Sequence, residues 1–170
     1  MRRTETTYSR EGLIMARDYE KCLSSMCHHV SNDSYYGKPF LLEPFQRENI
    51  WKPIFATGSM EGGRFKRRFR RVIIGLPSGY GKTELAAATV LTVATMEVIH
   101  NGQYGVVASS KDQVRNIFEK IATMIKLNDT WKSQWDIGKD VITHNETGAK
   151  IMVLPNKPDA LESWHFNVLI

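Results

Sequence analysis

The sequence predicts an α/β fold with a largely parallel sheet and helices on both of its faces. A β-branched run, Val72-Ile73-Ile74, is followed directly by a glycine-containing turn and then by a long apolar stretch with helical character. Strand-like and helix-like segments alternate from there to the end of the chain. Such alternation is typical of folds built on a parallel sheet. With 170 residues, 42% hydrophobic and 24% charged, the chain has the size and composition of one folded domain.

Two helices are expected before the β-branched run. Apolar side chains recur at helical spacing over residues 9–30. A second helix should begin at Pro44, because proline suits the first position of a helix, and should run to about Phe55. We therefore expect residues 1–38 to form an N-terminal helical extension and residues 39–170 to form the main domain.

The sheet and its helices are expected after the basic region that follows Phe55. Residues 71–76 predict a buried strand, and residues 82–100 predict a helix that is apolar nearly all round and buried on several sides. Ser110 and Gln113 have the pattern of a capping box at the start of another helix. Further strands are expected at 104–108, 140–143, 150–154 and 166–170. The chain ends within the last of these, so the sheet is expected to be incomplete at its C-terminal end.

Composition excludes several classes of protein. No apolar run approaches the roughly 18 residues that a membrane span needs, and the N-terminus lacks the apolar segment of a secretory signal. Cys22 and Cys27 are too few for a disulfide framework and suit a reducing, cytosolic compartment. Because His28 and His29 lie beside Cys27, a metal site is one alternative. The favoured interpretation is that the thiols lie on a helix face and that the histidines lie on the surface.

The net charge of +5 comes from one basic run. Six cations fall within eight positions, and without them the net charge would be 5 − 6 = −1. They are Arg64, Lys66, Arg67, Arg68, Arg70 and Arg71. Such a run can neutralise the phosphates of a nucleic acid, or it can be a solvated loop that leads into a strand. The sequence leaves both open, with Arg67 and Arg68 as the candidate contacts.

The strongest functional motif is the turn after the β-branched run, Pro77-Ser78-Gly79-Tyr80-Gly81-Lys82-Thr83. A phosphate chain needs many donors within a small radius, and the backbone N–H groups of a tight turn at a helix N-terminus supply them. Lys82 would reach the β- and γ-phosphates, and Thr83 would offer its hydroxyl to Mg²⁺. Leu76 stands where the general P-loop pattern has glycine. The strand expected before the turn and the helix expected after it still favour nucleotide binding over a chance match.

A second motif, Leu42-Glu43-Pro44-Phe45-Gln46, lies about 30 residues before this turn. A glutamine amide donates and accepts at once, so Gln46 can recognise both N6 and N7 of adenine. In isolation the motif would be only a helix start with a surface glutamine. Upstream of a P-loop, adenine recognition is the favoured interpretation.

A third motif joins the expected strand at 104–108 to the helix that follows it. Ligands of open α/β sheets bind at the carboxyl ends of strands, where Ser109, Ser110 and Gln113 stand. A helix cap explains Ser110 and Gln113 adequately. A phosphate contact with nucleic acid through Lys111 or Arg115 is the less favoured alternative.

Taken together, these residues resemble the ATPase domain of the large terminase subunit of tailed bacteriophages, the motor that packages viral DNA. The resemblance covers about residues 39–170 and rests on the order of the motifs. These are 42–46, the basic run, 77–83, 108–113, a hairpin at 140–154 and 166–170. The Leu76-Pro77 opening of the P-loop is similar to a variant of that family.

The resemblance implies a P-loop NTPase fold of the RecA-like (ASCE) type, with ATP and Mg²⁺ as ligands. Gln46 would contact adenine, residues 77–83 would hold the phosphates, and Thr83 would contact Mg²⁺. Residues 167–170 are similar to the strand that leads into the acidic Walker B pair. The chain ends before that pair and holds no nuclease domain, so we expect these 170 residues to bind nucleotide weakly and hydrolyse it poorly.

One position departs from the family, and other functions stay open. The family usually has Arg or Lys where Ser78 stands, and a serine cannot stabilise charge on the γ-phosphate.

The expected partners are double-stranded DNA, the small terminase subunit, the portal protein and further copies in an oligomeric motor, within the cytoplasm of the host cell. One alternative is a superfamily-2 helicase or translocase. Another is a non-catalytic domain that binds a motor partner or DNA.

Overall fold

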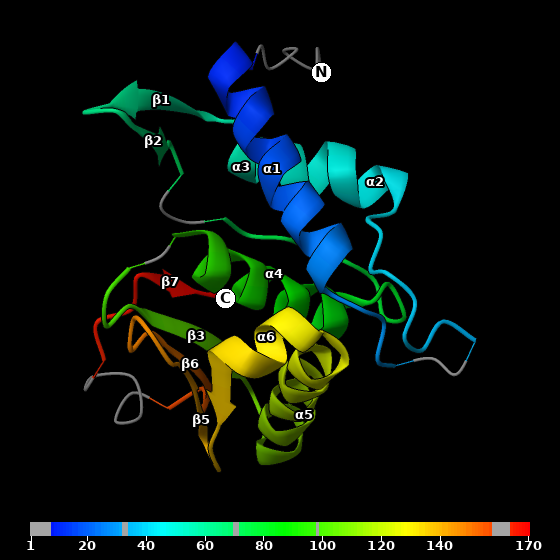
Figure 1. Ribbon diagram of the computed structural model, residues 1–170. Helices are drawn as coiled ribbons and strands as arrows, with labels where there is room; N and C mark the ends of the chain where they lie inside the picture. The colour runs from blue at the N-terminus through cyan, green and yellow to red at the C-terminus, as the bar shows by residue number, and fades with distance from the viewer. Residues whose placement is uncertain (1–7, 32–33, 70–71, 98, 158–163) are drawn as a thin grey trace. The chain divides into compact units, whose positions relative to one another are not determined.

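The computed structural model describes residues 8–31, 34–69, 72–97, 99–157 and 164–170, and it has a mixed α/β fold (Figure 1). Contacts divide the chain into two compact units. The first contains Met1–Lys21 and Leu41–Leu76, and the second contains Cys22–Phe40 and Pro77–Ile170. The expected domains at 1–38 and 39–170 stay a prediction. Among the described residues, no helix combines the length and apolar content that a bilayer span requires.

The first unit contains the two helical segments that the sequence predicts. The expected helix at 9–30 is α1 (Arg10–Met26), which is shorter at both ends and continues into the second unit. The expected helix at 44–55 is a continuous helical run that contains one π-helical segment. Its parts are α2 (Pro44–Gln46), η1 (Arg47–Trp51) and α3 (Lys52–Phe55).

Aromatic side chains form the core of the first unit. The ring of Trp51, which is almost fully buried, lies 4.4 Å from the ring of Phe55, centroid to centroid. The Nε1–H of Trp51 donates to the carbonyl oxygen of Ala16 at 3.0 Å. Phe55 also stacks on Tyr19 of α1 at 4.6 Å. These contacts fasten α1 to the helical run because the two large rings bury apolar area that would otherwise face water.

A short β-hairpin follows the helical run, where the sequence indicated only a glycine-containing loop. Its strands are β1 (Gly58–Glu61) and β2 (Arg64–Arg67), which pair antiparallel. The turn consists of Gly62 and Gly63, whose φ angles are +56° and +78°. Two-residue turns with positive φ at both positions match the twist of the strands, and glycine adopts that conformation without strain. The hairpin extends beyond the helices of its unit (Figure 1).

The second unit is built on a five-stranded mixed sheet with the order β4-β5-β6-β3-β7. Its strands are β3 (Gln103–Ala108), β4 (Trp135–Ile137), β5 (Val141–His144), β6 (Lys150–Pro155) and β7 (Val168–Leu169). β3 pairs parallel with β6 and with β7, whereas β4–β5 and β5–β6 are antiparallel. The four expected strands after residue 100 are thus present, and β4 was not expected. The sheet is mixed rather than largely parallel.

Two long helices, α4 (Lys82–Glu97) and α5 (Lys111–Leu127), cover this sheet. They pack against each other, and both contact β3 and β6, so they lie on the same face (Figure 1). A short helix, α6 (Asp129–Gln134), follows α5 and was not expected. Within the described residues of this unit, helices on both faces of the sheet are therefore not found. The nearly all-apolar α4 is buried as expected, since eight of its residues are buried.

The expected buried strand at residues 71–76 is wrong. Residues 72–76 form no strand, and the Ile73 side chain is 99% exposed. Arg70 and Arg71 lie outside the described residues. A β-branched run becomes a strand only where another strand accepts its hydrogen bonds. Both edges of β3 are already paired, by β6 and by β7, and no described strand pairs with residues 72–76.

Candidate functional site

The turn at residues 77–83, called the glycine turn below, leads directly into α4. Its two glycines have φ angles of +84° for Gly79 and +69° for Gly81, which L side chains rarely adopt. Space does not explain the glycines, because a Cβ at either position would meet no atom within 4 Å. Backbone conformation is therefore the reason for glycine at these two positions. Alternating right- and left-handed residues form concave rows of N–H groups that suit anions.

Lys82 and Thr83 stand at the start of α4, on the exposed side of this turn. The Nζ of Lys82 donates to the carbonyl oxygen of Pro77 at 2.8 Å, so the side chain folds back across the turn. Thr83 is exposed, as are Ser78 and Tyr80. The N–H groups of the first turn of α4 and the positive end of its dipole lie at the same place. Backbone donors, an ammonium and a hydroxyl that converge on an open turn fit the chemistry of a triphosphate with Mg²⁺.

The glycine turn lies toward the carboxyl end of β3. α4 has 16 residues and is about 24 Å long, and it runs back along β3, which it contacts. Only a short connection joins the end of α4 to Gln103 at the start of β3. The N-terminus of α4 therefore lies toward the carboxyl end of β3. This is the side of an α/β sheet on which ligands bind.

The third sequence motif is a helix cap, as the sequence indicated. Ser110 Oγ accepts a hydrogen bond from the backbone N–H of Gln113 at 3.2 Å. The side-chain oxygen of Gln113 accepts from Ser109 Oγ at 2.8 Å. Lys111 is exposed, and Arg115 pairs with Glu119 at 2.8 Å, which raises the pKa of the guanidinium. Contacts of Lys111 and Arg115 with nucleic acid stay a prediction.

Gln46 has a structural role in the first unit. Gln46 is buried, with only 6% of its surface exposed. Its Oε1 accepts a hydrogen bond from the backbone N–H of Glu43 at 3.0 Å. The Glu43 carboxylate in turn accepts from the backbone N–H of Gln46, which completes a capping box. The sequence motif therefore starts α2, and recognition of adenine by Gln46 stays a prediction.

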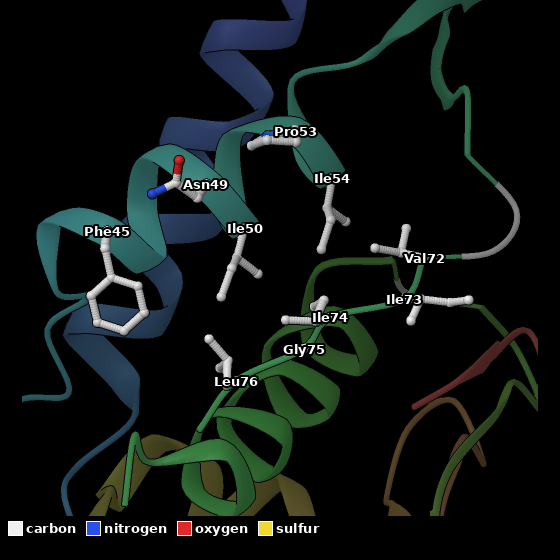
Figure 2. Close-up of a pocket in the computed structure, with 10 residues that line it drawn as sticks. All are labelled: Phe45, Asn49, Ile50, Pro53, Ile54, Val72, Ile73, Ile74, Gly75 and Leu76. Carbon is white, nitrogen blue, oxygen red and sulfur yellow. The ribbon is translucent and has the colours of Figure 1, made fainter. Parts of the chain in front are cut away.

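A cavity of about 230 Å³ lies in the first unit beside the helical run (Figure 2). Figure 2 shows Phe45, Ile50 and Ile54 from the helical run on one side, and Val72, Ile74 and Leu76 from the irregular segment on the other. Asn49 is the polar side chain among the residues that line it. Small-molecule sites combine apolar walls with several convergent polar groups. This cavity has apolar walls and a single amide, so it does not match a nucleotide site.

The cysteine and histidine cluster shows no sign of a metal site. Among the described residues, no group of three His, Cys, Asp or Glu side chains lies close enough together to hold a metal ion. Burial raises the pKa of the Cys22 thiol to about 11, and it also raises the pKa of Cys27, which is fully buried. Both thiols are therefore protonated near neutral pH and poor ligands or nucleophiles. The sulfur of Cys27 packs at 3.7 Å from the Thr92 hydroxyl of α4.

Glu84 fastens the segment after α1 to the first turn of α4, a link that the sequence analysis missed. Its Oε1 accepts from the backbone N–H of Val30 at 2.6 Å, and its Oε2 lies 3.6 Å from Nδ1 of His29. The side chain of Glu84 is only 11% exposed. No local sequence pattern predicts this contact, because the two partners lie 54 positions apart in the chain. Glu84 follows Thr83 directly, so the contact holds the helix start that carries the glycine turn.

Replacing Glu84 by alanine should lower the free energy of unfolding by about 1–3 kcal/mol, because the Val30 N–H loses its acceptor. Glutamine at this position keeps an oxygen acceptor and should retain most of the stability. The check is urea unfolding of both variants beside Glu119→Ala, which removes an exposed pair and should change stability by under about 1 kcal/mol. Equal stability of the Glu84→Ala variant and the wild type would contradict this role.

Comparison with known proteins gives a similarity of structure. No protein-family model and no curated protein sequence matches the chain. The structure is similar to the crystal structure of the HK97 bacteriophage large terminase, with a TM-score of 0.68 and 14% sequence identity. The chain has a terminase-like fold. The match covers 91% of this chain and 36% of that protein, so the chain spans about a third of the terminase's length.

The structural similarity concerns the fold and says nothing about which ligands the motifs bind. At 14% identity the structural match concerns the path of the chain. The glycine turn and the residues around it must therefore carry any assignment of function.

Proposed function

We propose that this chain is the ATP-binding part of a terminase-like motor that packages double-stranded DNA into a viral procapsid. The observation that supports it best is the glycine turn, which places Lys82 and Thr83 at the N-terminus of a buried helix on a terminase-like fold. The P-loop of NTPases also places a lysine and a hydroxyl residue at the start of a helix, after a glycine-containing turn. The chain spans 36% of the terminase's length, so hydrolysis and DNA movement are proposed for the whole protein.

Each residue of the turn has a distinct task in this proposal. The positive φ angles of Gly79 and Gly81 aim the backbone N–H groups of the turn at the phosphates. Lys82 exchanges the Pro77 carbonyl for the β- and γ-phosphates, where its charge gains more than at a neutral acceptor. Thr83 directs its hydroxyl to Mg²⁺. ATP, when bound with Mg²⁺, supplies the phosphoanhydride bond whose cleavage drives the motor.

Two further residues have proposed tasks in nucleotide binding. The proposal that Gln46 recognises the adenine ring rests on the family resemblance alone. Ser78 is exposed in the turn and carries no charge, so the cation that stabilises the γ-phosphate comes from another residue or another subunit. In a motor, further copies of the chain, the small subunit and the portal protein are the partners, and the site operates in the cytoplasm of the infected cell.

Thermal unfolding of the 170-residue chain with and without ATP·Mg²⁺ tests this function. At a ligand concentration one hundred times Kd, binding adds about 2.7 kcal/mol of stability, which raises Tm by about 5–10 °C in a chain of this size. EDTA should reduce the rise, since Mg²⁺ neutralises the phosphates. A Tm that is unchanged by millimolar ATP·Mg²⁺ would overturn the proposal, and the non-catalytic alternative would replace it.

A further inference from the structure

The hairpin of the first unit separates its side chains into two different faces. In an antiparallel pair, residues directly opposite each other share a face. Glu61 is opposite Arg64, and Ser59 is opposite Lys66. These four residues and Arg68 make up what we call the basic face. Met60 is opposite Phe65, and Gly58 is opposite Arg67, so the other face is mainly apolar.

The basic face carries three cations and one acid, and all of them are exposed. Arg64, Lys66 and Arg68 alternate along the chain and thus stand about 7 Å apart. Arg68 follows β2 and continues its antiparallel pairing, since its backbone N–H donates to the carbonyl oxygen of Thr57 at 2.9 Å. Lys66 pairs with Glu61 at 2.9 Å, which lowers the pKa of that carboxyl. Exposed pairs of this kind are weak and exchange partners readily.

Arg67 belongs to the other face and is held by the fold. Its guanidinium carbon lies 5.7 Å from the centre of the Phe55 ring, a cation–π contact with the core of the first unit. The side chain is only partly exposed. Of the two candidate contacts in the basic run, Arg68 therefore faces solvent with Arg64 and Lys66, whereas Arg67 anchors the hairpin to α3.

We propose that the basic face of the hairpin binds the sugar–phosphate backbone of duplex DNA. Its net charge is +2 from three cations and Glu61, and the Gly62-Gly63 turn fixes the cations in one row. Single strands are usually bound on aromatic platforms, and the aromatic residue of the strands, Phe65, lies on the opposite face. Cations without a stacking surface suit the backbone of a duplex. This inference rests on the proposed function, because a packaging motor brings a duplex to the chain.

The test is the salt dependence of binding to a short duplex of random sequence, measured by fluorescence anisotropy. Substituting Arg64→Gln, Lys66→Gln and Arg68→Gln together should lower the slope of log K against log salt by about two to three, or roughly 0.9 for each lost phosphate contact. The matched control is Lys126→Gln, Lys132→Gln and Lys139→Gln, which removes the same charge from exposed positions of the second unit. The control should keep the wild-type slope. An equal loss in both triple variants would show that only net charge matters and would overturn the proposal.

A gain of affinity provides a second readout that misfolding cannot imitate. Glu61→Gln removes the acid from the basic face and should tighten duplex binding about two- to fivefold. Glu146→Gln, at an exposed turn of the second unit, should leave it unchanged. An unchanged affinity of the Glu61→Gln variant would count against the basic face. A single-stranded oligonucleotide or polyglutamate that displaces the duplex at equal charge concentration would also overturn the assignment to duplex DNA.

The proposed function and this inference can fail separately. The hairpin triple variant should keep the wild-type rise of Tm with ATP·Mg²⁺, because the substitutions lie outside the glycine turn. Duplex binding that depends on the basic face, without any response to ATP, would support the hairpin and contradict the nucleotide site. A rise of Tm with ATP·Mg²⁺, together with duplex binding that is unchanged in the hairpin triple variant, would support the nucleotide site and contradict the basic face.

Discussion

Replacing Lys82 by alanine is expected to weaken the binding of ATP·Mg²⁺ about a hundredfold, because charge-assisted hydrogen bonds to two phosphates are lost. At a nucleotide concentration that gives wild-type protein about 2.7 kcal/mol of stability, the variant should gain only about 0.4 kcal/mol, and its Tm should rise correspondingly little. The stability of the free protein should change little, since Lys82 is exposed and its Nζ donates to the carbonyl oxygen of Pro77 within the same turn. Isothermal titration calorimetry and thermal unfolding measure the two quantities.

Lys111→Ala is the matched control for this experiment. Lys111 is the first residue of α5 as Lys82 is the first residue of α4, and both side chains are exposed. The preceding residues differ, since Ser110 caps α5 with its side chain whereas glycines precede Lys82. Lys111→Ala should therefore keep the wild-type affinity for nucleotide. Equal effects of the two substitutions would mean that any lysine at a helix start contributes, which contradicts a dedicated phosphate site.

Replacing Trp51 by alanine should destabilise the first unit by about 3–5 kcal/mol, the usual cost of removing a large buried aromatic side chain. Trp51 is 1% exposed, packs on Phe55 and donates to the carbonyl oxygen of Ala16. Its loss leaves a cavity between α1 and the helical run and removes the hydrogen bond to the Ala16 carbonyl. Hydrogen exchange of the amides in α1, η1 and α3 should accelerate accordingly.

Trp51→Phe separates packing from hydrogen bonding. Phenylalanine keeps much of the ring contact with Phe55 and lacks the N–H donor, so it should cost clearly less than alanine. The control for a tryptophan in general is Trp164→Ala, at a partly exposed position near the C-terminus, for which we expect a smaller loss. A Trp51→Ala variant with wild-type exchange rates in α1 would contradict this description of the core.

The longer helices and most strands were predictable because their signals are local. The apolar face of α1, the all-apolar α4 and the cap of α5 at Ser110 are each visible in one short window of sequence. The hairpin was missed because its two four-residue strands are rich in charge, although Gly62-Gly63 is itself a turn signal. Residues 72–76 have the composition of a strand, and whether such a run pairs depends on partners that its own sequence does not specify.

In the candidate site, too, the features set by neighbouring residues were predictable, and the contacts between distant residues were not. The positive φ angles of Gly79 and Gly81 follow from the motif itself, since glycine is the residue that a tight turn requires. The capping role of Gln46 also follows from its spacing from Glu43, although the sequence interpretation favoured adenine. The contact of Glu84 with Val30 is non-local, and so is the contact of Arg67 with Phe55. Such pairs become visible only when the chain is folded.

The most direct test of the nucleotide site is the response of individual backbone amides in ¹⁵N-labelled protein to ATP·Mg²⁺. Phosphates held by the glycine turn accept hydrogen bonds from its N–H groups, so the NMR signals of Gly79, Gly81, Lys82 and Thr83 should shift most. The amides of Asp129 and Thr130, at the start of α6, should shift far less. Unchanged signals from residues 79–83 at saturating ATP·Mg²⁺, or shifts confined to other parts of the chain, would contradict the claim that this turn is a P-loop.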